Sequence, residues 1–343
     1  MKILILKPSS LGDVVHAMPV LRLLKLHIPQ SEIHWWLETG LVPLLADDPD
    51  LTGIIPFHRK RWGAPLRWTE IYGSVREMRR KRFDWAIDLQ GLARSGIFTW
   101  LANAHVNIGL GDNREGAHAA YDLLAPSMSF GTHAVDRYLS VLPILGVPVH
   151  QDFKWLPDRP LVSAQVQEKW KPNSARWVAL LPGARWLNKR WPVQNFAQLT
   201  RRVLSLSPDL KIAIIGSKDD QMLGAEISQV DKERCVDLTG KTSLLEMIEW
   251  IRLSELVITN DTGPMHVAAA LKRPIIALFG PTNPDATGPY GQRQNVIQVS
   301  NLPCVPCLKD YCSFKEPLAC LHGITAQLVY ERARGILLNG ALI

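Results

Sequence analysis

Short apolar runs alternate with amphipathic helical patterns along most of the chain, and this alternation restricts the fold more than any other feature. Runs of about five residues bounded by polar loops are typical of buried parallel strands. Strands are predicted at residues 2–6, 33–37, 85–89, 177–181, 211–215, 256–259 and 275–279. Helices are predicted after the first strand and at residues 193–204, 243–253, 264–270 and 326–338. The pattern indicates an α/β protein with parallel, doubly wound sheets.

The length indicates two such sheets rather than one. A chain of 343 residues exceeds one ordinary core, and 47% apolar residues suffice to fill two. The alternation weakens between residues 142 and 174, where proline and polar residues accumulate, so this segment is the predicted linker. We place the boundary near Asp158, with domains at residues 1–158 and 159–343. Whether the last helix packs back on the first domain stays open.

The net charge of +7 and the pI of about 9.2 favour anionic partners. Nucleic acid, phosphorylated sugars, nucleotides and an acidic membrane surface all fit this charge. No DNA- or RNA-binding motif accompanies it, so nucleic acid is the poorest of these. The sequence shows neither a secretory leader nor an apolar stretch of about 20 residues. We expect a cytoplasmic protein, soluble or peripherally attached to a membrane.

The N-terminal stretch MKILILKPSSLGDVVHAMP predicts a buried strand, a loop and a helix. Gly12 and Asp13 fall where the helix should begin. From these residues alone, Asp13 is best interpreted as a helix N-cap.

The stretch ELVITNDTGPMHVAAAL predicts an anion site at the start of a helix. An apolar strand ends at Asn260, and Pro264 suits the first helical position. Thr262 or Gly263 can cap the helix, whose free N–H groups attract anions. His266, in the first turn, can reach the same anion. The alternative is a capped structural helix with Asp261 as a turn residue.

The stretch GARWLNKRWP places Lys189 and Arg190 at the carboxyl end of another predicted strand. One of them can neutralise a diphosphate, and a solvated basic loop is the alternative. Neither the P-loop pattern nor the glycine fingerprint of dinucleotide-binding proteins occurs at the first strand–helix turn.

Four of the five cysteines cluster with the spacing C-x2-C-x4-C-x7-C, at Cys304, Cys307, Cys312 and Cys320. Four thiolates in one short segment suit a structural zinc or iron site. Reduced structural thiols are the alternative, because disulfides are rare in a reducing compartment.

Two basic runs lie in the first half. FHRKRWGAPLRW mixes cationic and aromatic residues in a loop, which suits an acidic membrane surface or a phosphorylated glycolipid. The second run, residues 76–82, follows a helical pattern and indicates a solvated helix face.

Several of these motifs together resemble the ADP-heptose:lipopolysaccharide heptosyltransferases, glycosyltransferase family 9. The resemblance covers nearly the whole chain and is carried by KPSSLGDVVHAMP, IDLQGLARSG, HAVDRYL, GARWLNKRWP, GKTSLLEMIEWI and NDTGPMHVAAALKRPIIALFGPTNP. The forms SSLGDVVH and HAVDR are most similar to heptosyltransferase I, which adds the first heptose to Kdo on lipid A. The cysteine segment is more similar to heptosyltransferase II.

The resemblance implies a GT-B architecture of two Rossmann-like domains that face a central cleft. The N-terminal domain would receive the acceptor and the C-terminal domain would hold ADP-heptose. Asp13 matches the general base of an inverting transfer, which accepts a proton from the acceptor hydroxyl. The donor-binding residues implied by the motifs are Ser10, Gly12, Lys189, Asp261, Thr262, Gly263 and His266. No metal is needed for catalysis in this family.

On the acceptor side the resemblance implies Arg59, Arg61, Arg114 and Arg137. The implied acceptor is Kdo–lipid A, and the implied location is the cytoplasmic face of the inner membrane, against its anionic leaflet. In one departure, Arg185 and Trp186 stand near the lysine where some type I enzymes carry adjacent threonines. The alternatives are an enzyme with the same donor and another acceptor, or a catalytically silent nucleotide-sugar-binding protein.

Overall fold

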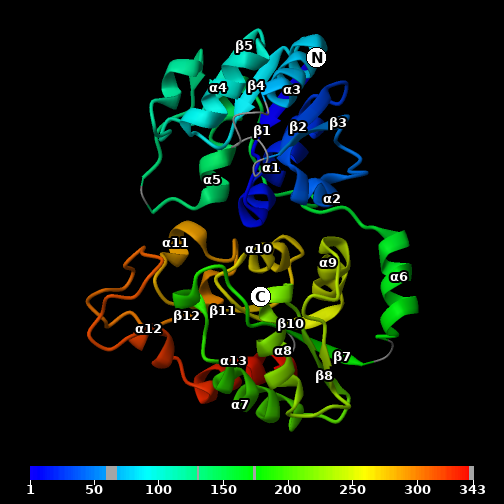
Figure 1. Ribbon diagram of the computed structural model, residues 1–343, viewed down its shortest axis with the longest axis vertical. Coiled ribbons are helices and arrows are strands. Elements are labelled where there is room, and N and C mark those ends of the chain that lie inside the picture. The colour runs from blue at the N-terminus through cyan, green and yellow to red at the C-terminus, as the bar shows by residue number, and fades with distance from the viewer. Residues whose placement is uncertain (59–67, 130, 173–174, 340–343) are drawn as a thin grey trace. The chain divides into compact units, whose positions relative to one another are not determined.

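The computed structural model describes residues 1–58, 68–129, 131–172 and 175–339. The chain divides into two compact units, Met1–Pro157 and Asp158–Ile343, and each contains its own sheet (Figure 1). The boundary predicted from sequence lies one residue further along, after Asp158.

The first unit is built on six parallel strands in the order β3-β2-β1-β4-β5-β6. The strands are β1 (Lys2–Leu6), β2 (Glu32–Glu38), β3 (Gly53–Phe57), β4 (Trp85–Asp88), β5 (Val106–Gly109) and β6 (Leu123–Leu124). The helices are α1 (Leu11–His27), α2 (Val42–Leu45), α3 (Trp68–Lys81), α4 (Ala93–Ala102) and α5 (Ala134–Leu139). Strand β1 is central because its side chains from Ile3 to Leu6 are fully buried.

The second unit repeats this topology with six parallel strands in the order β12-β11-β10-β7-β8-β9. The strands are β7 (Arg176–Leu181), β8 (Leu210–Ile214), β9 (Cys235–Asp237), β10 (Ser254–Asn260), β11 (Ile275–Phe279) and β12 (Val296–Gln298). The helices are α6 (Pro160–Trp170), α7 (Val193–Leu204), α8 (Gln221–Ser228), α9 (Leu244–Leu253), α10 (Gly263–Ala270), α11 (Pro284–Thr287), α12 (Ala319–His322) and α13 (Ala326–Asn339).

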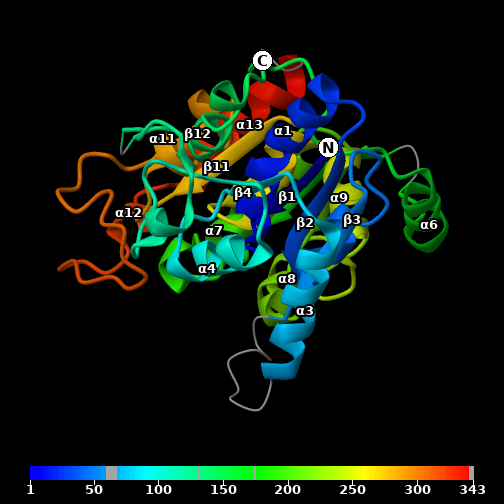
Figure 2. The same cartoon turned by 90° about the horizontal axis from the view of Figure 1, so that it is seen from above.

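Helices cover both faces of the second sheet. Helices α7 and α8 pack together, and α13 joins them on α7, whereas α9 and α10 form the other layer (Figure 1). Helix α6 packs beside α9 at the side of this unit (Figures 1 and 2). The last helix therefore has its packing partners, α7, β10 and β11, within the second unit.

Each unit has an aromatic-rich core. In the first, the Trp36 ring lies 4.5 Å from Phe57 and 4.7 Å from Phe98, centroid to centroid. In the second, Trp191 and Phe196 meet edge to face at 4.8 Å. Aromatic pairs of this geometry add to the free energy gained by burial. Because each set of pairs lies within one unit, each unit has a core of its own.

The doubly wound order fixes where ligands can bind. In both sheets the strand order reverses next to the first strand, between β1 and β4 and between β7 and β10. The loops that leave these strand pairs at their carboxyl ends diverge, which opens a crevice at this switch point. The motifs singled out in the sequence lie there: Asp13 follows β1, Lys189 follows β7, and Asp261 follows β10.

The structure confirms the parallel α/β class and corrects some details. The edge strands β3, β6, β9 and β12 and the neighbouring strand β5 were missed, because they are short and partly exposed. Strand β3 also contains glycine and proline. The predicted linker at 142–174 contains helix α6. No helix among the described residues combines the length and the apolar character that crossing a bilayer requires.

Candidate active site

Asp13 lies in the first turn of α1 and is held by two neighbours. The N–H and the hydroxyl of Ser10 donate to Asp13 Oδ2 at 3.0 and 2.9 Å. The Tyr138 hydroxyl donates to Asp13 Oδ1 at 3.3 Å. Ser10 is the N-cap and Asp13 is the third residue of the helix, so the prediction of Asp13 as the N-cap was wrong. Asp13 closes a capping box instead.

Lys7 lies directly after β1 and contacts Tyr138. Its side chain is only 2% exposed, and its ammonium lies 4.6 Å from the centroid of the Tyr138 ring. Burial lowers the pKa of Lys7, against the attraction of Asp13 and Asp88. Burial also raises the pKa of Tyr138 well above its usual value, and the charge of Asp13 adds to this. Tyr138 therefore remains a neutral hydrogen-bond donor to the carboxylate.

Asp88, the last residue of β4, is the neighbour of Leu6 in the sheet. It is fully buried and accepts hydrogen bonds from the N–H groups of Gln90 and Gly91 and from the Tyr121 hydroxyl, the last at 2.7 Å. Burial raises the pKa of Asp88, and these hydrogen bonds oppose the shift. Asp88 thus joins the loop after β4 to Tyr121 at the switch point.

Four arginines were predicted to bind the acceptor, and the structure describes two of them. Arg137 pairs with Asp112 at 2.5 Å, and Arg114 is exposed. Both raise the positive potential around Lys7. Arg59 and Arg61 lie outside the described residues. Ser10 and Gly12, predicted to bind the donor, belong to the first unit together with Asp13.

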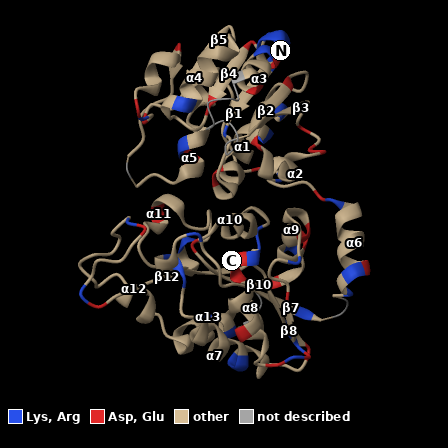
Figure 3. Ribbon diagram, viewed as in Figure 1, with Lys and Arg blue, Asp and Glu red and all other residues tan. Residues whose placement is uncertain are grey.

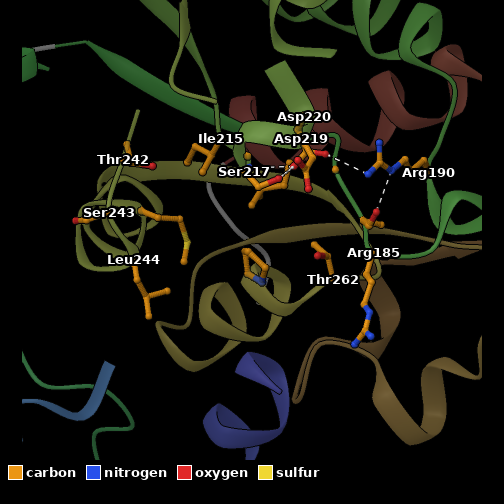
Figure 4. Close-up of a pocket in the computed structure, with 16 residues that line it drawn as sticks. Arg185, Arg190, Ile215, Ser217, Asp219, Asp220, Thr242, Ser243, Leu244 and Thr262 are labelled. Atoms are coloured by element: carbon orange, nitrogen blue, oxygen red, sulfur yellow. Dashed lines mark hydrogen bonds and ion pairs between the residues drawn. The ribbon is translucent and has the colours of Figure 1, made fainter. Parts of the chain in front are cut away.

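The second unit contains a pocket of about 570 Å³ at its switch point (Figure 4). Its walls come from the loops after β7, β8, β9 and β10. The lining residues are Leu181, Gly183, Ala184, Arg185, Arg190, Ile215, Gly216, Ser217, Asp219, Asp220, Thr242, Ser243, Leu244, Met247, Thr262 and Pro264. The volume falls in the range of small-molecule sites.

Asn260, the last residue of β10, holds both ends of the loop that follows β7. Its amide donates to the Pro182 carbonyl at 2.7 Å, and its Oδ1 accepts from the Trp191 N–H at 3.1 Å. Asn260 is fully buried. The loop that carries residues 183–190 is therefore anchored at both ends to the end of β10.

Lys189 is bound to a carboxylate in this structure. Its ammonium lies 2.6 Å from Asp261 Oδ2, which also accepts from the Thr282 hydroxyl at 2.6 Å. The ammonium lies 4.6 Å from the centroid of the Trp186 ring. The structure thus brings together the two predicted donor residues Lys189 and Asp261. Thr262 lines the pocket, Gly263 begins α10, and His266 is buried in its first turn.

Arg190 is also paired. Its guanidinium lies 3.3 Å from Asp220 Oδ1 and donates to the Ala184 carbonyl at 2.9 Å. Asp220 in turn accepts from the N–H and the hydroxyl of Ser217. A Cβ at Gly183 would collide with the Asp220 carboxylate, so glycine is required for this approach. Arg190 therefore braces two loops of the pocket.

The four clustered cysteines line one small cavity of about 30 Å³. All are free thiols, and Cys312 Sγ accepts from the Leu318 N–H at 3.3 Å. Burial raises the pKa of the Cys320 thiol, with the three neighbouring cysteines adding to the shift. Among the residues that the structure describes, no three His, Cys, Asp or Glu side chains are grouped to hold a metal ion. The thiols meet without a metal-ligating arrangement.

Known proteins share both the sequence and the fold of this chain. Residues 72–317 match the family model of glycosyltransferase family 9 (heptosyltransferase). Lipopolysaccharide heptosyltransferase 1 of Pseudomonas aeruginosa is 29% identical over 92% of this chain and 88% of its own length. Lipopolysaccharide heptosyltransferase 2 of Salmonella typhimurium is 31% identical over 87% of this chain and 88% of its own. The solved structure of Escherichia coli ADP-heptose LPS heptosyltransferase II superimposes with a TM-score of 0.79 at 25% identity, covering 99% of both chains.

Two Rossmann-like units, each with polar residues at its switch point, together with these relatives define a glycosyltransferase of GT-B fold. The family model covers well over half of the chain. The chain belongs to glycosyltransferase family 9, the heptosyltransferases, as the sequence motifs predicted.

Proposed function

We propose that the chain is an inverting heptosyltransferase that moves heptose from ADP-heptose to Kdo–lipid A, with Asp13 as the general base. The observation that carries the catalytic part is the Asp13 carboxylate, fixed at the end of β1 by Ser10 and Tyr138. As the acceptor hydroxyl oxygen bonds to C1 of the heptose, its proton passes to Asp13. The bond from C1 to the ADP oxygen breaks, and the configuration at C1 inverts. A fixed carboxylate can act as a base within hydrogen-bond reach of the hydroxyl.

The second unit is the proposed donor domain, and its pocket would hold the nucleotide. The exposed carboxylate of Asp219 on the pocket wall suits the hydroxyls of a ribose. Thr262 and Pro264 line the pocket at the start of α10, so the positive end of this helix and its free backbone N–H groups, which Pro264 itself lacks, lie at the same wall. Lys189 would meet the diphosphate, while Gly263 and His266 would complete the donor turn.

The first unit is the proposed acceptor domain. Ser10 and Gly12 would approach the transferred sugar beside Asp13, and Arg114 and Arg137 would face the anionic acceptor. The domain would attach peripherally to the anionic cytoplasmic face of the inner membrane. Support comes from α3 and α4, which pack together. The exposed Trp100 precedes Leu101, whose carbonyl accepts from the Arg79 guanidinium at 2.9 Å at the basic end of α3, and Tyr72 is exposed near the start of α3. Elsewhere, basic and acidic residues are interspersed over both units (Figure 3).

No metal has a role in the proposed reaction. Departure of ADP would be stabilised by the helix end and by cationic side chains. Zinc or iron bound by Cys304, Cys307, Cys312 and Cys320 stays a prediction about folding, and elemental analysis of the purified protein tests it. The arrangement of the thiols described above does not favour it.

A second candidate function keeps the donor and changes the acceptor to the first core heptose. It is favoured by the 31% identity to the Salmonella heptosyltransferase 2.

The experiment is a measurement of ADP release from ADP-heptose by the full chain, alone and with each acceptor. We expect release only with Kdo–lipid A, and NMR of the product should show inversion at C1. Release only with heptosyl-Kdo–lipid A would support the second candidate. Binding of ADP-heptose without release in any mixture would indicate a silent binding protein and contradict the proposal.

A further inference from the structure

The donor pocket has two cations on its walls, Arg185 and Arg190, and they differ in what they contact. Arg190 is held by Asp220 and by the Ala184 carbonyl. Arg185 is exposed, and within the described ranges no hydrogen bond or ion pair engages its guanidinium. Figure 4 shows its side chain extending away from the Arg190–Asp220 pair.

Lys189, the cation that the sequence motif favours for the diphosphate, is compensated by Asp261 at 2.6 Å. The same carboxylate accepts from Thr282 and is 7% exposed. An anion that approached Lys189 would meet the negative charge of Asp261 as well. The net attraction of this pair for a diphosphate is therefore weaker than that of an unpaired cation at the same distance.

The position of Arg185 suits an anion that lies across the start of α10. Arg185 belongs to the loop after β7, which the Asn260 hydrogen bonds anchor to the end of β10. Thr262 and Pro264 of the neighbouring helix start line the same pocket. A guanidinium and a helix N-terminus in one pocket provide charge and directed N–H donors, which are the groups that bind phosphates.

We propose that Arg185 is a further side-chain ligand of the donor diphosphate, in addition to Lys189, whose charge is already compensated by Asp261. This inference rests on the proposed function for the identity of the donor, but not for the diphosphate contact itself. A charge-assisted hydrogen bond at a partly exposed site corresponds to about a tenfold change in affinity.

The test compares the native full chain with Arg185→Gln by titration calorimetry, with ADP, UDP, AMP and adenosine as probes. Arg185→Lys tests rescue, since it retains the charge but not the fork geometry. Arg201→Gln is the matched control, because Arg201 is an exposed arginine of the same unit that does not line the pocket. Unchanged melting temperatures show that the variants are folded.

We expect Arg185→Gln to weaken ADP binding about tenfold, to weaken AMP binding less, and to leave adenosine binding unchanged. Arg185→Lys should bind ADP with intermediate affinity, and Arg201→Gln should bind like the native chain. Equal ADP affinity of Arg185→Gln and the native chain would overturn the inference.

The two proposals fail in different ways. If the native chain bound UDP but not ADP, the ADP-sugar donor would be wrong, and the loss of UDP affinity in Arg185→Gln would still support the diphosphate contact. If the native chain bound neither diphosphate, both proposals would be overturned.

Discussion

At the scale of single residues, Lys7 is the side chain whose position is hardest to explain by stability alone. A buried ammonium loses its hydration, and its ring contact with Tyr138 replaces only part of it. Lys7 lies with Asp13, Asp88, Arg114 and Arg137 in one network of charges. We infer that it supports the electrostatics around Asp13.

Replacement of Lys7 by methionine should separate stability from activity. Because burial lowers the pKa of Lys7, the unfolded chain binds more protons than the folded chain between the lowered pKa and the ordinary value. The stability of the native protein should rise with pH through that window, and Lys7→Met should remove this rise. At pH 7 the variant should be as stable as the native chain or more stable, while turnover falls about tenfold.

Thermal unfolding at several pH values and steady-state kinetics measure the two effects. Lys2→Met is the control, since Lys2 begins the same strand but is partly exposed and pairs with Glu32 at 3.8 Å. Full turnover combined with a large loss of stability in Lys7→Met would contradict this interpretation.

Cys235 provides a second test at this scale. Burial raises the pKa of its thiol to about 11. At pH 8 about one Cys235 in a thousand is a thiolate, so it should react far more slowly with iodoacetamide than the exposed Cys312. Peptide mass spectrometry after timed alkylation measures both rates, and equal rates would show that Cys235 is not buried as described.

The raised pKa of Cys235 also affects stability. Between pH 9 and 11 the unfolded chain binds fewer protons than the folded chain, so the contribution of this residue to the free energy of unfolding falls as pH rises.

At the scale of elements, one wall of the pocket is formed by the N-terminal cap of helix α9. Ser243 begins α9 with a capping box: its hydroxyl accepts from the Glu246 N–H at 3.2 Å, and its own N–H donates to Glu246 at 2.6 Å. Lys169 of α6 binds the same carboxylate at 2.8 Å. Burial alone would raise the pKa of Glu246, but these hydrogen bonds hold it below its usual value.

Ser243→Ala should therefore destabilise the second unit by about 1 kcal/mol, or about 2–4 °C in Tm. The part that depends on ionised Glu246 is present above its unfolded pKa and is lost as pH falls through the lowered folded value. Ser228→Ala is the control, because the Ser228 hydroxyl donates to the Ala225 carbonyl at the end of α8. Equal melting temperatures for both variants would show that the capping box contributes nothing.

The sequence predicted the interior strands of the two sheets better than the strands at their edges. The central strands β1, β7 and β11 were predicted well because their burial makes them continuous apolar runs. The edge strand β6 has two exposed leucines and no comparable pattern. In the candidate site, motifs that are local in the chain singled out Asp13, Lys189 and Asp261, which the structure places at the switch points of the two sheets. Tyr138 was missed because it meets Asp13 across 125 residues, which no local pattern records.

At the scale of the whole molecule, the two units are assigned different substrates. If the second unit is the donor domain, ADP should protect only that unit from amide hydrogen exchange. Protection is expected in residues 182–190, 215–220, 242–247 and 261–266, which form the pocket and the Lys189–Asp261 pair. Exchange measured with and without ADP, with adenosine as the control, tests this. Equal protection across both units, or protection confined to the first, would contradict the assignment.

The central claim is that the Asp13 carboxylate removes the proton from the acceptor, and turnover of Asp13→Asn with ADP-heptose and Kdo–lipid A tests it most directly. The amide keeps the size of the side chain but cannot accept this proton. Glu32→Gln, at an exposed carboxylate at the start of β2, is the matched control. We predict that Asp13→Asn lowers kcat by at least about a hundredfold with unchanged ADP affinity, whereas Glu32→Gln retains native turnover. Native turnover in Asp13→Asn would contradict the assignment of Asp13 as the base.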